Sequence, residues 1–249
     1  MEPNELGLNI HILTLIAHKL RTPLSIINGY SEAVVAQAGK EKFSPFTAKA
    51  LEEICQQGGH MGQLIEKLAA FNKVMMVEKN ALDKRPIPIN KMLKHCTSLV
   101  LMQRNSAGLP TDSSSDATFV KRGVQVDIDC PANLTINGNE EMLRLCISEL
   151  MENAIKFNNK MEKIIKVQVA NHGDSISLSV RDYGVGVRPQ DVENLFKPFF
   201  QVDDDFTGQV NGWGLGLSMV QRVVTLHGGT VSVVSDRGLG SIFTLKFPL

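Results

Sequence analysis

Apolar side chains in the first third of the chain recur at every third or fourth position, the spacing that places them on one face of a helix. The pattern predicts a helix over residues 6–38, a turn at 39–45 and a second helix over 46–78. The apolar stripe of the first helix consists of Leu13, Ile16, Leu20, Leu24 and Ile27. Two such helices bury little surface alone, so we expect two helical hairpins to pair into a four-helix bundle in a homodimer.

Three glycines, Gly58, Gly59 and Gly62, lie in the middle of the second predicted helix. Each glycine in a helix interior costs up to about 1 kcal/mol relative to alanine. The helix should therefore be locally soft. Two explanations remain open, close packing against a neighbouring helix and a functional hinge.

Beyond residue 80 the pattern changes to short strands mixed with helices. Two prolines and a charge cluster predict a linker at 83–88, and a polar, serine-rich composition predicts a flexible segment at 104–120. We expect helices over 89–103, 140–157 and 217–226, a strand over 124–128, and two hairpins, 164–170 with 176–182 and 230–234 with 242–247. This order predicts an α/β sandwich after the helical hairpin, and hence an α+β chain.

Length and composition restrict the class of protein. A chain of 249 residues exceeds the usual size of one domain, and we divide it into a helical hairpin, 1–80, and a compact domain, 81–249. The formal net charge is zero without a cluster of Lys or Arg, which argues against nucleic-acid binding. The four cysteines are isolated, as expected for buried reduced thiols in a cytoplasmic protein.

Membrane and targeting signals are also missing from the pattern. There is no run of about 18 apolar residues and no leader segment, so we expect neither membrane insertion nor secretion of this chain. The chain starts close to the first predicted helix. We therefore expect an upstream sensor module in a longer parent protein, which is either membrane-anchored or soluble.

His18 precedes the sequence Arg21-Thr22-Pro23-Leu24 in the first predicted helix. At about 100° per residue, His18 lies roughly 200° from both Ile16 and Leu20, so its imidazole points away from the apolar stripe. Pro23 removes a helical hydrogen bond and should bend the helix below the histidine. A single helical histidine is more often an ordinary surface or core residue, but this segment resembles the phospho-acceptor box of two-component sensor histidine kinases.

Five later segments resemble the nucleotide-binding motifs of the same family, in the family's order. They are Glu149–Phe157 (N box), Arg181–Gly186 (first glycine box), Leu195–Phe200 (aromatic box), Gly212–Leu217 (second glycine box) and Gly238–Phe243. One glycine-rich segment would be weak evidence, because glycines also mark ordinary turns. The ordered series covers nearly the whole chain. It implies the ATP-binding fold that histidine kinases share with gyrase, mismatch-repair and heat-shock chaperone ATPases.

The resemblance implies a role for each motif residue. His18 would take the γ-phosphoryl group of ATP, and Asp182 would accept a hydrogen bond from the adenine amino group. Asn153 would hold Mg²⁺ with Glu149 as a second candidate ligand, and Lys156 would reach a phosphate. The remaining residues bordering the nucleotide would be Gly184, Gly186, Gly212, Gly214, Leu215, Gly216 and Leu217. Spacing alone places Glu149, Asn153 and Lys156 on one face of an apolar helix, which is unfavourable unless something polar binds there.

Two segments depart from the usual pattern of the family. Lys19 stands where most members have an acidic residue that accepts the imidazole N–H, and a lysine cannot accept a hydrogen bond. Losing a positioned base costs about 10²–10⁴ in rate. The predicted ATP lid, 201–211, has no basic residue and contains Asp203–Asp205, which should repel phosphate. Lys197, Arg21 or a partner subunit would then have to supply a cation.

These residues predict an ATP-dependent protein-histidine kinase core that passes phosphate to an aspartate on a response-regulator receiver domain. Two alternatives follow from Lys19 and the uncharged lid, an ATP-binding signalling scaffold with weak catalysis and a sensor biased toward phosphatase activity. Thr22 matches the position whose hydroxyl orients water for dephosphorylation in bifunctional members of the family. An ATPase in which Glu149 activates water is a third alternative. Transfer within one subunit and transfer between subunits both stay open.

Overall fold

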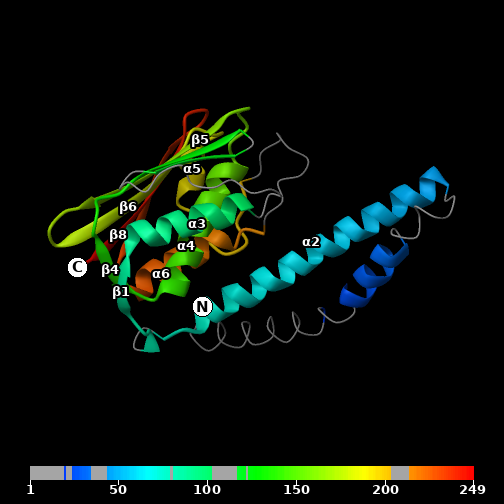
Figure 1. The fold of residues 1–249 in the computed structure, drawn as a ribbon, viewed down its shortest axis with the longest axis horizontal. Coiled ribbons are helices and arrows are strands. Elements are labelled where there is room, and N and C mark those ends of the chain that lie inside the picture. The colour runs from blue at the N-terminus through cyan, green and yellow to red at the C-terminus, as the bar shows by residue number, and fades with distance from the viewer. Residues whose placement is uncertain are drawn as a thin grey trace. The chain divides into compact units, whose positions relative to one another are not determined.

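The computed structural model describes residues 20, 24–34, 44–78, 81–102, 117–121, 123–202 and 213–249. The chain divides into two compact units, Met1–Met76 and Val77–Leu249. Helices make up the described part of the first unit, and a mixed sheet with helices makes up the second (Figure 1). The α+β class is therefore confirmed.

The described residues of the first unit form two antiparallel helices (Figure 1). Residues 24–34 are helical, and α2 spans Pro45–Met76. Leu24 and Ile65 are both buried and in contact, and the Asn28 side chain lies against Gly58. The bounds of α2 agree with the predicted helix 46–78 to within two residues. Most of the first predicted helix and of the turn at 39–45 lies outside the described residues.

The glycines of α2 differ in their surroundings. A Cβ atom on Gly58 would overlap the side-chain oxygen of Asn28, so a larger residue would have to displace that side chain. Among the described residues, none lies within 4 Å of the corresponding position at Gly59, and Gly62 meets Leu24 at 3.9 Å. Packing explains Gly58, whereas a hinge remains a prediction for the other two glycines.

The second unit is built on a six-stranded sheet in the order β2-β3-β5-β6-β8-β7. β3 and β5 are parallel, and the other neighbouring pairs are antiparallel. The strands are β2 (Ala117–Lys121), β3 (Val124–Asp129), β5 (Lys163–Asn171), β6 (Ser175–Asp182), β7 (Thr230–Asp236) and β8 (Gly240–Pro248). Both predicted hairpins, β5–β6 and β7–β8, are confirmed.

Three helices cover one face of this sheet, with α4 between the other two (Figure 1). They are α3 (Ile89–Met102), α4 (Glu140–Lys156) and α6 (Gly216–Leu226), and a short helix, α5, spans Pro189–Val192. The strands alternate accordingly. In β5, Val167 is buried on the helix side and Lys166 is exposed on the other side. The predicted α/β sandwich is confirmed.

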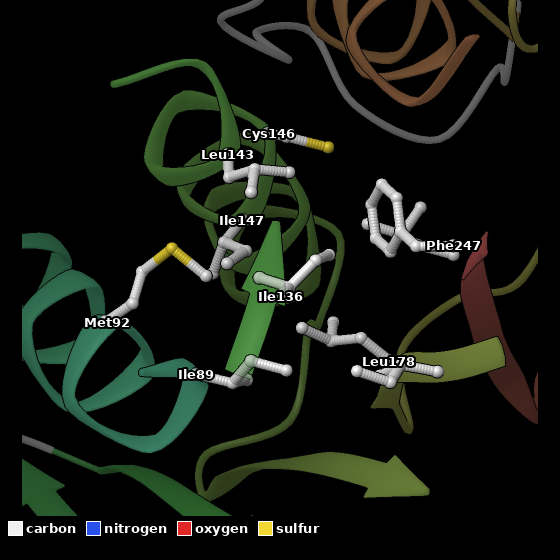
Figure 2. Close-up of a pocket in the computed structure, with 10 residues that line it drawn as sticks. Ile89, Met92, Ile136, Leu143, Cys146, Ile147, Leu178 and Phe247 are labelled. Carbon is white, nitrogen blue, oxygen red and sulfur yellow. The ribbon is translucent and has the colours of Figure 1, made fainter. Parts of the chain in front are cut away.

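A small apolar cavity of about 10 Å³ lies in the core between α3, α4 and the sheet. Met92, Leu143, Ile147 and Phe247 are among the side chains that point into it (Figure 2). This volume is about that of one water-sized probe, and a dry apolar lining offers water no partners. The cavity is therefore a packing defect and too small for an organic ligand.

One prediction about an irregular segment is wrong, and a second is wrong at its C-terminal end. Within the predicted linker 83–88, Arg85–Pro88 forms β1, which pairs antiparallel with β4 (Thr135–Gly138) and buries Ile87. Proline is tolerated there because a two-stranded sheet consists only of edge strands. Within the predicted flexible segment 104–120, residues 117–120 belong to β2, whereas residues 104–116 lie outside the described residues. Strands of four or five residues show too few alternations for the pattern to reveal them, and β4 escaped prediction for the same reason.

All four cysteines are free. Cys96, Cys130 and Cys146 are buried, as predicted, and Cys55 is half-buried. Burial raises the pKa of the Cys96 and Cys146 thiols, which keeps them protonated and unreactive. In the described part of the chain, no helix has both the length and the apolar character needed to cross a bilayer.

Candidate functional site

Asp182 is the last residue of β6, and its side chain is only 5% exposed. The backbone N–H of Gly184 donates to its Oδ1 at 2.8 Å. Burial raises the pKa of the Asp182 carboxyl, and the backbone donors of Gly184 and Ser241 partly oppose this effect. An enclosed carboxylate fixed at a strand end is an acceptor held ready for a donor group.

The backbone packs tightly around Asp182. A Cβ atom on Gly184 would overlap the Phe157 carbonyl oxygen and lie 2.9 Å from the Asn158 Cα, and the Val185 N–H donates to the same carbonyl at 3.0 Å. Gly240 has φ +92°, and a Cβ there would overlap the Asp182 carbonyl oxygen. The first glycine box is thus fastened directly to the end of α4.

The N box supplies three polar side chains from α4. Glu149 is 6% exposed, whereas Asn153 and Lys156 are half-buried. The Lys156 ammonium lies 4.7 Å from the centre of the Phe157 ring. The Glu149 carboxylate lies against Gly216, where a Cβ would overlap it. Because Gly216 opens α6, this contact joins the N box to the second glycine box and places a negative group at a helix N-terminus.

The aromatic box and the second glycine box hold each other. Phe199 donates its N–H to the Gly214 carbonyl at 2.9 Å, and a Cβ on Gly214 would lie 2.6 Å from the Phe199 carbonyl carbon. Gly214 has φ +66°. Leu215, which is buried, is the N-cap residue of α6 and gives no side-chain cap, so this helix start has backbone donors that suit an anion. Leu217 is half-buried in the first turn.

A serine that the sequence did not reveal fixes the loop of the first glycine box from the other side. Ser235 of β7 accepts a hydrogen bond from the Val187 N–H at 2.8 Å, and Gly238 donates to the Val185 carbonyl at 2.7 Å. Gly186 has φ +65°, and a Cβ there would overlap the Asp236 carbonyl oxygen. About fifty residues separate these partners along the chain, so no local pattern indicates the contact.

The structure thus joins the end of β6, the C-terminal half of α4 and the start of α6. These elements carry all the predicted nucleotide-binding residues except Gly212. His18, Lys19, Thr22 and Gly212, together with lid residues 203–211, lie outside the described residues. Among the described side chains, no group of three or more His, Cys, Asp or Glu forms a metal-binding cluster.

Two family models match the chain. Residues 138–249 match the histidine kinase-, DNA gyrase B- and HSP90-like ATPase family, and residues 11–74 match the His Kinase A (phospho-acceptor) domain. The second unit therefore has an ATPase-type fold, preceded by a phospho-acceptor domain.

Curated relatives match nearly the whole chain. The phosphate regulon sensor protein PhoR of Pseudomonas aeruginosa is 29% identical over 232 residues, 93% of this chain and 48% of the relative. The sensor histidine kinase RcsC of Salmonella typhimurium is 31% identical over 243 residues, 95% of this chain and 23% of the relative. The chain thus spans less than half the length of these relatives. It belongs to the two-component sensor histidine kinases and comprises their kinase core.

Solved structures share the fold. Full-length ShkA in complex with AMPPNP has a TM-score of 0.68 at 23% identity, covering 96% of this chain and 45% of that chain. The Acinetobacter baumannii histidine kinase AdeS has a TM-score of 0.56 at 19% identity, covering 93% of this chain and 97% of that chain.

Proposed function

We propose that this chain is an ATP-dependent protein-histidine kinase core that phosphorylates itself on His18. The observation that carries the proposal is the buried Asp182 carboxylate, fixed by the Gly184 N–H at the end of β6. An enclosed acceptor of this kind suits the amino group of adenine. Residues 1–80 would form the dimerisation and histidine-phosphotransfer hairpin and 81–249 the catalytic domain, with the family matches over 11–74 and 138–249 as support.

The elements around Asp182 would contribute to ATP binding in different ways. Glycines at 184, 186, 214 and 216 let the segments around the site pack tightly together, because a side chain at any of them would overlap neighbouring protein atoms. The Lys156 ammonium and the N-terminal amides of α6 would attract the phosphates. Gly212, Leu215 and Leu217 would complete the border.

The residues present fit a magnesium ion. Asn153 and Glu149 offer one or two protein oxygen ligands on α4, and Mg²⁺ usually takes that number from the protein, with phosphate and water completing its six ligands. The ion would neutralise charge on the phosphate oxygens. The Glu149 carboxylate also lies against the start of α6, so its proposed role as an ion ligand ranks below that of Asn153.

In the proposed reaction, the neutral imidazole of His18 attacks the γ-phosphorus in line. The bond from that phosphorus to the β–γ bridging oxygen breaks, and ADP leaves with the negative charge. The phosphoryl group then passes to an aspartate on a response-regulator receiver domain. A homodimer would bring the hairpins together as a four-helix bundle, and the core would act in the cytoplasm, where ATP is available.

A second candidate is a sensor biased toward phosphatase activity. It is favoured by Lys19, which cannot accept the imidazole N–H, and by the lid segment 201–211, which lacks a cation. In this candidate, Thr22 would orient the water that removes phosphate from the regulator.

Incubation with γ-labelled ATP and Mg²⁺ distinguishes these functions. Acid-labile, base-stable label on the protein that His18→Ala removes, with ATP binding retained, indicates a kinase. Free phosphate without labelled protein indicates an ATPase, and neither product indicates a scaffold. Label that persists in His18→Ala would refute His18 as the acceptor, and His11 and His60 would then be tested. Loss of regulator dephosphorylation in Thr22→Ala would identify the phosphatase role.

A further inference from the structure

His227 connects helices α4 and α6 through both nitrogens of its ring. It follows the last residue of α6 and is 5% exposed. Its Nδ1 lies 2.7 Å from the Val223 carbonyl oxygen, and the Asn139 backbone N–H donates to its Nε2 at 3.0 Å. A carbonyl only accepts and a backbone N–H only donates. The two contacts therefore define a neutral imidazole that carries its proton on Nδ1.

Neighbouring atoms hold the ring in place. A Cβ on Gly138, the last residue of β4, would lie 2.9 Å from the His227 Cδ2 and 3.0 Å from its Nε2, so only glycine allows this approach. The Phe247 ring of β8 stands edge-on to the imidazole, with ring centres 6.1 Å apart at 83°. The imidazole is thus confined between β4, β8 and the start of α4.

Asn139 extends the contact to two further segments. Its Oδ1 accepts the Met142 N–H at 3.1 Å and so caps α4. Its Nδ2 donates to the Asp83 carbonyl at 3.3 Å, in the segment that leads into β1. Asn139, whose backbone N–H is bonded to His227, therefore positions both the start of α4 and the segment before β1.

The surroundings favour the neutral ring. Burial lowers the pKa of His227, the nearby Lys84 lowers it further, and the bond to the Val223 carbonyl raises it in part. Charged residues on the packed elements include Asp83 and Lys84 before β1, Glu140 and Glu141 in the first turn of α4, Arg222 on α6 and Lys246 on β8, and α4 carries Arg144, Glu149, Glu152 and Lys156 in its later turns. Asp83 and Glu140 are each paired with an arginine, Arg85 and Arg144.

We propose that His227 is an acid-sensitive joint between α6, α4 and the segment before β1. In the neutral state it accepts the Asn139 N–H. A solvent proton bound at Nε2 removes the acceptor lone pair, sets two donors face to face and adds a positive charge at the positive end of the α4 helix dipole. Protonation therefore releases the start of α4.

The joint has a consequence for the candidate site, because α4 carries Asn153 and α6 begins at Gly216. Acid should weaken nucleotide binding by loosening both helices. This consequence rests on the proposed function, whereas the joint itself does not.

Nitrogen NMR of the full chain with labelled histidine tests the joint directly. Substitution His227→Gln assigns the His227 signal among the six histidines. We expect the Nδ1–H form at neutral pH and a midpoint of protonation below the ordinary histidine value of 6.5. His172, which is exposed near the β5–β6 turn, supplies a control position. An Nε2–H form, or a midpoint at or above 6.5, would overturn the proposal.

Unfolding experiments from about pH 5 to 7.5 provide the second test. The unfolded state binds the proton more readily than the folded state, so the unfolding constant should fall as pH rises toward about 6.5, by up to tenfold per pH unit. His227→Gln keeps a neutral donor and acceptor and should flatten this dependence, while the control His172→Gln should retain it. An unchanged slope in His227→Gln would refute the joint. Failure to bind ATP at any pH would instead count against the proposed function.

Discussion

Replacing Asp182 with asparagine should separate nucleotide binding from stability. The substitution keeps an oxygen that can accept the Gly184 N–H, now bonded at 2.8 Å, and nearly preserves the side-chain volume. It removes the negative charge and can present a donor amide to the adenine amino group, so donor would face donor. Leaving such a buried pair unsatisfied costs about 1–3 kcal/mol, which corresponds to roughly a 5- to 150-fold loss of ATP affinity.

The same substitution should leave the fold at least as stable. Burial raises the pKa of Asp182 from 3.8, so the folded state holds its proton more tightly than the unfolded chain. Folding stability therefore falls as pH rises from 3.8 through the raised pKa, and at neutral pH the ionised carboxylate destabilises the fold. Each unit of upward shift corresponds to about 1.4 kcal/mol. Asparagine removes this penalty.

Calorimetric titration with Mg-ATP and urea unfolding at neutral pH measure the two effects. Asp174→Asn is a suitable control, because Asp174 lies at the β5–β6 turn and its hydrogen bond with Ser175 lowers the pKa of its carboxyl. That variant should bind ATP normally and, at most, lose stability. Unchanged ATP affinity in Asp182→Asn would refute the assigned base contact. Global unfolding of the variant would refute the stability argument.

Three further predictions concern the helices and the core. Gly59→Ala should stabilise the fold by up to about 1 kcal/mol in urea unfolding, because no described residue lies within 4 Å of the added methyl group. Gly58→Ala should destabilise the fold by pushing away Asn28, and equal effects of the two substitutions would argue against the packing role of Gly58. Ile147→Ala, beside the apolar cavity, should lower the free energy of unfolding by about 2–5 kcal/mol. The control Val234→Ala, at an exposed position, should change it by close to zero. A loss below about 1 kcal/mol for Ile147→Ala would show that the cavity collapses. Lys19→Glu restores an acceptor for the imidazole N–H and should raise the initial rate of autophosphorylation about tenfold or more at saturating Mg-ATP; a slower variant, equally folded by circular dichroism, would show that Lys19 assists the reaction itself.

The sequence revealed elements whose signal is local. Helix α4 and the β5–β6 hairpin combine a clear period with turn residues at their ends, and their bounds were predicted to within one or two residues. β2 and β4 were missed because strands of five and four residues contain too few alternations. The linker prediction failed at β1, where pairing with a distant strand outweighs the effect of two prolines.

The candidate site also combines residues that local sequence motifs reveal with long-range contacts that they do not reveal. Asp182, Asn153 and the glycines stand in motifs that are continuous in sequence, so they could be identified. The contacts that position them are not continuous. Ser235 lies 48 residues from Val187, and Asn139 lies 88 residues from His227, and only the folded chain brings each pair together.

The position of β8 bears on how the second unit is made in the cell. Although it is the last of the strands in sequence, β8 pairs with β6 on one side and β7 on the other, so it fills an interior place in the sheet. In a nascent chain that still lacks residues 240–248, the edge of β6 that pairs with β8 has no partner strand. The sheet can therefore be completed only after β8 has emerged from the ribosome. A chain interrupted shortly before that point would lose Gly240 and Ser241, which pack against or donate to Asp182, and with them the geometry proposed for ATP. Incomplete copies would also expose an unpaired strand edge, which favours aggregation.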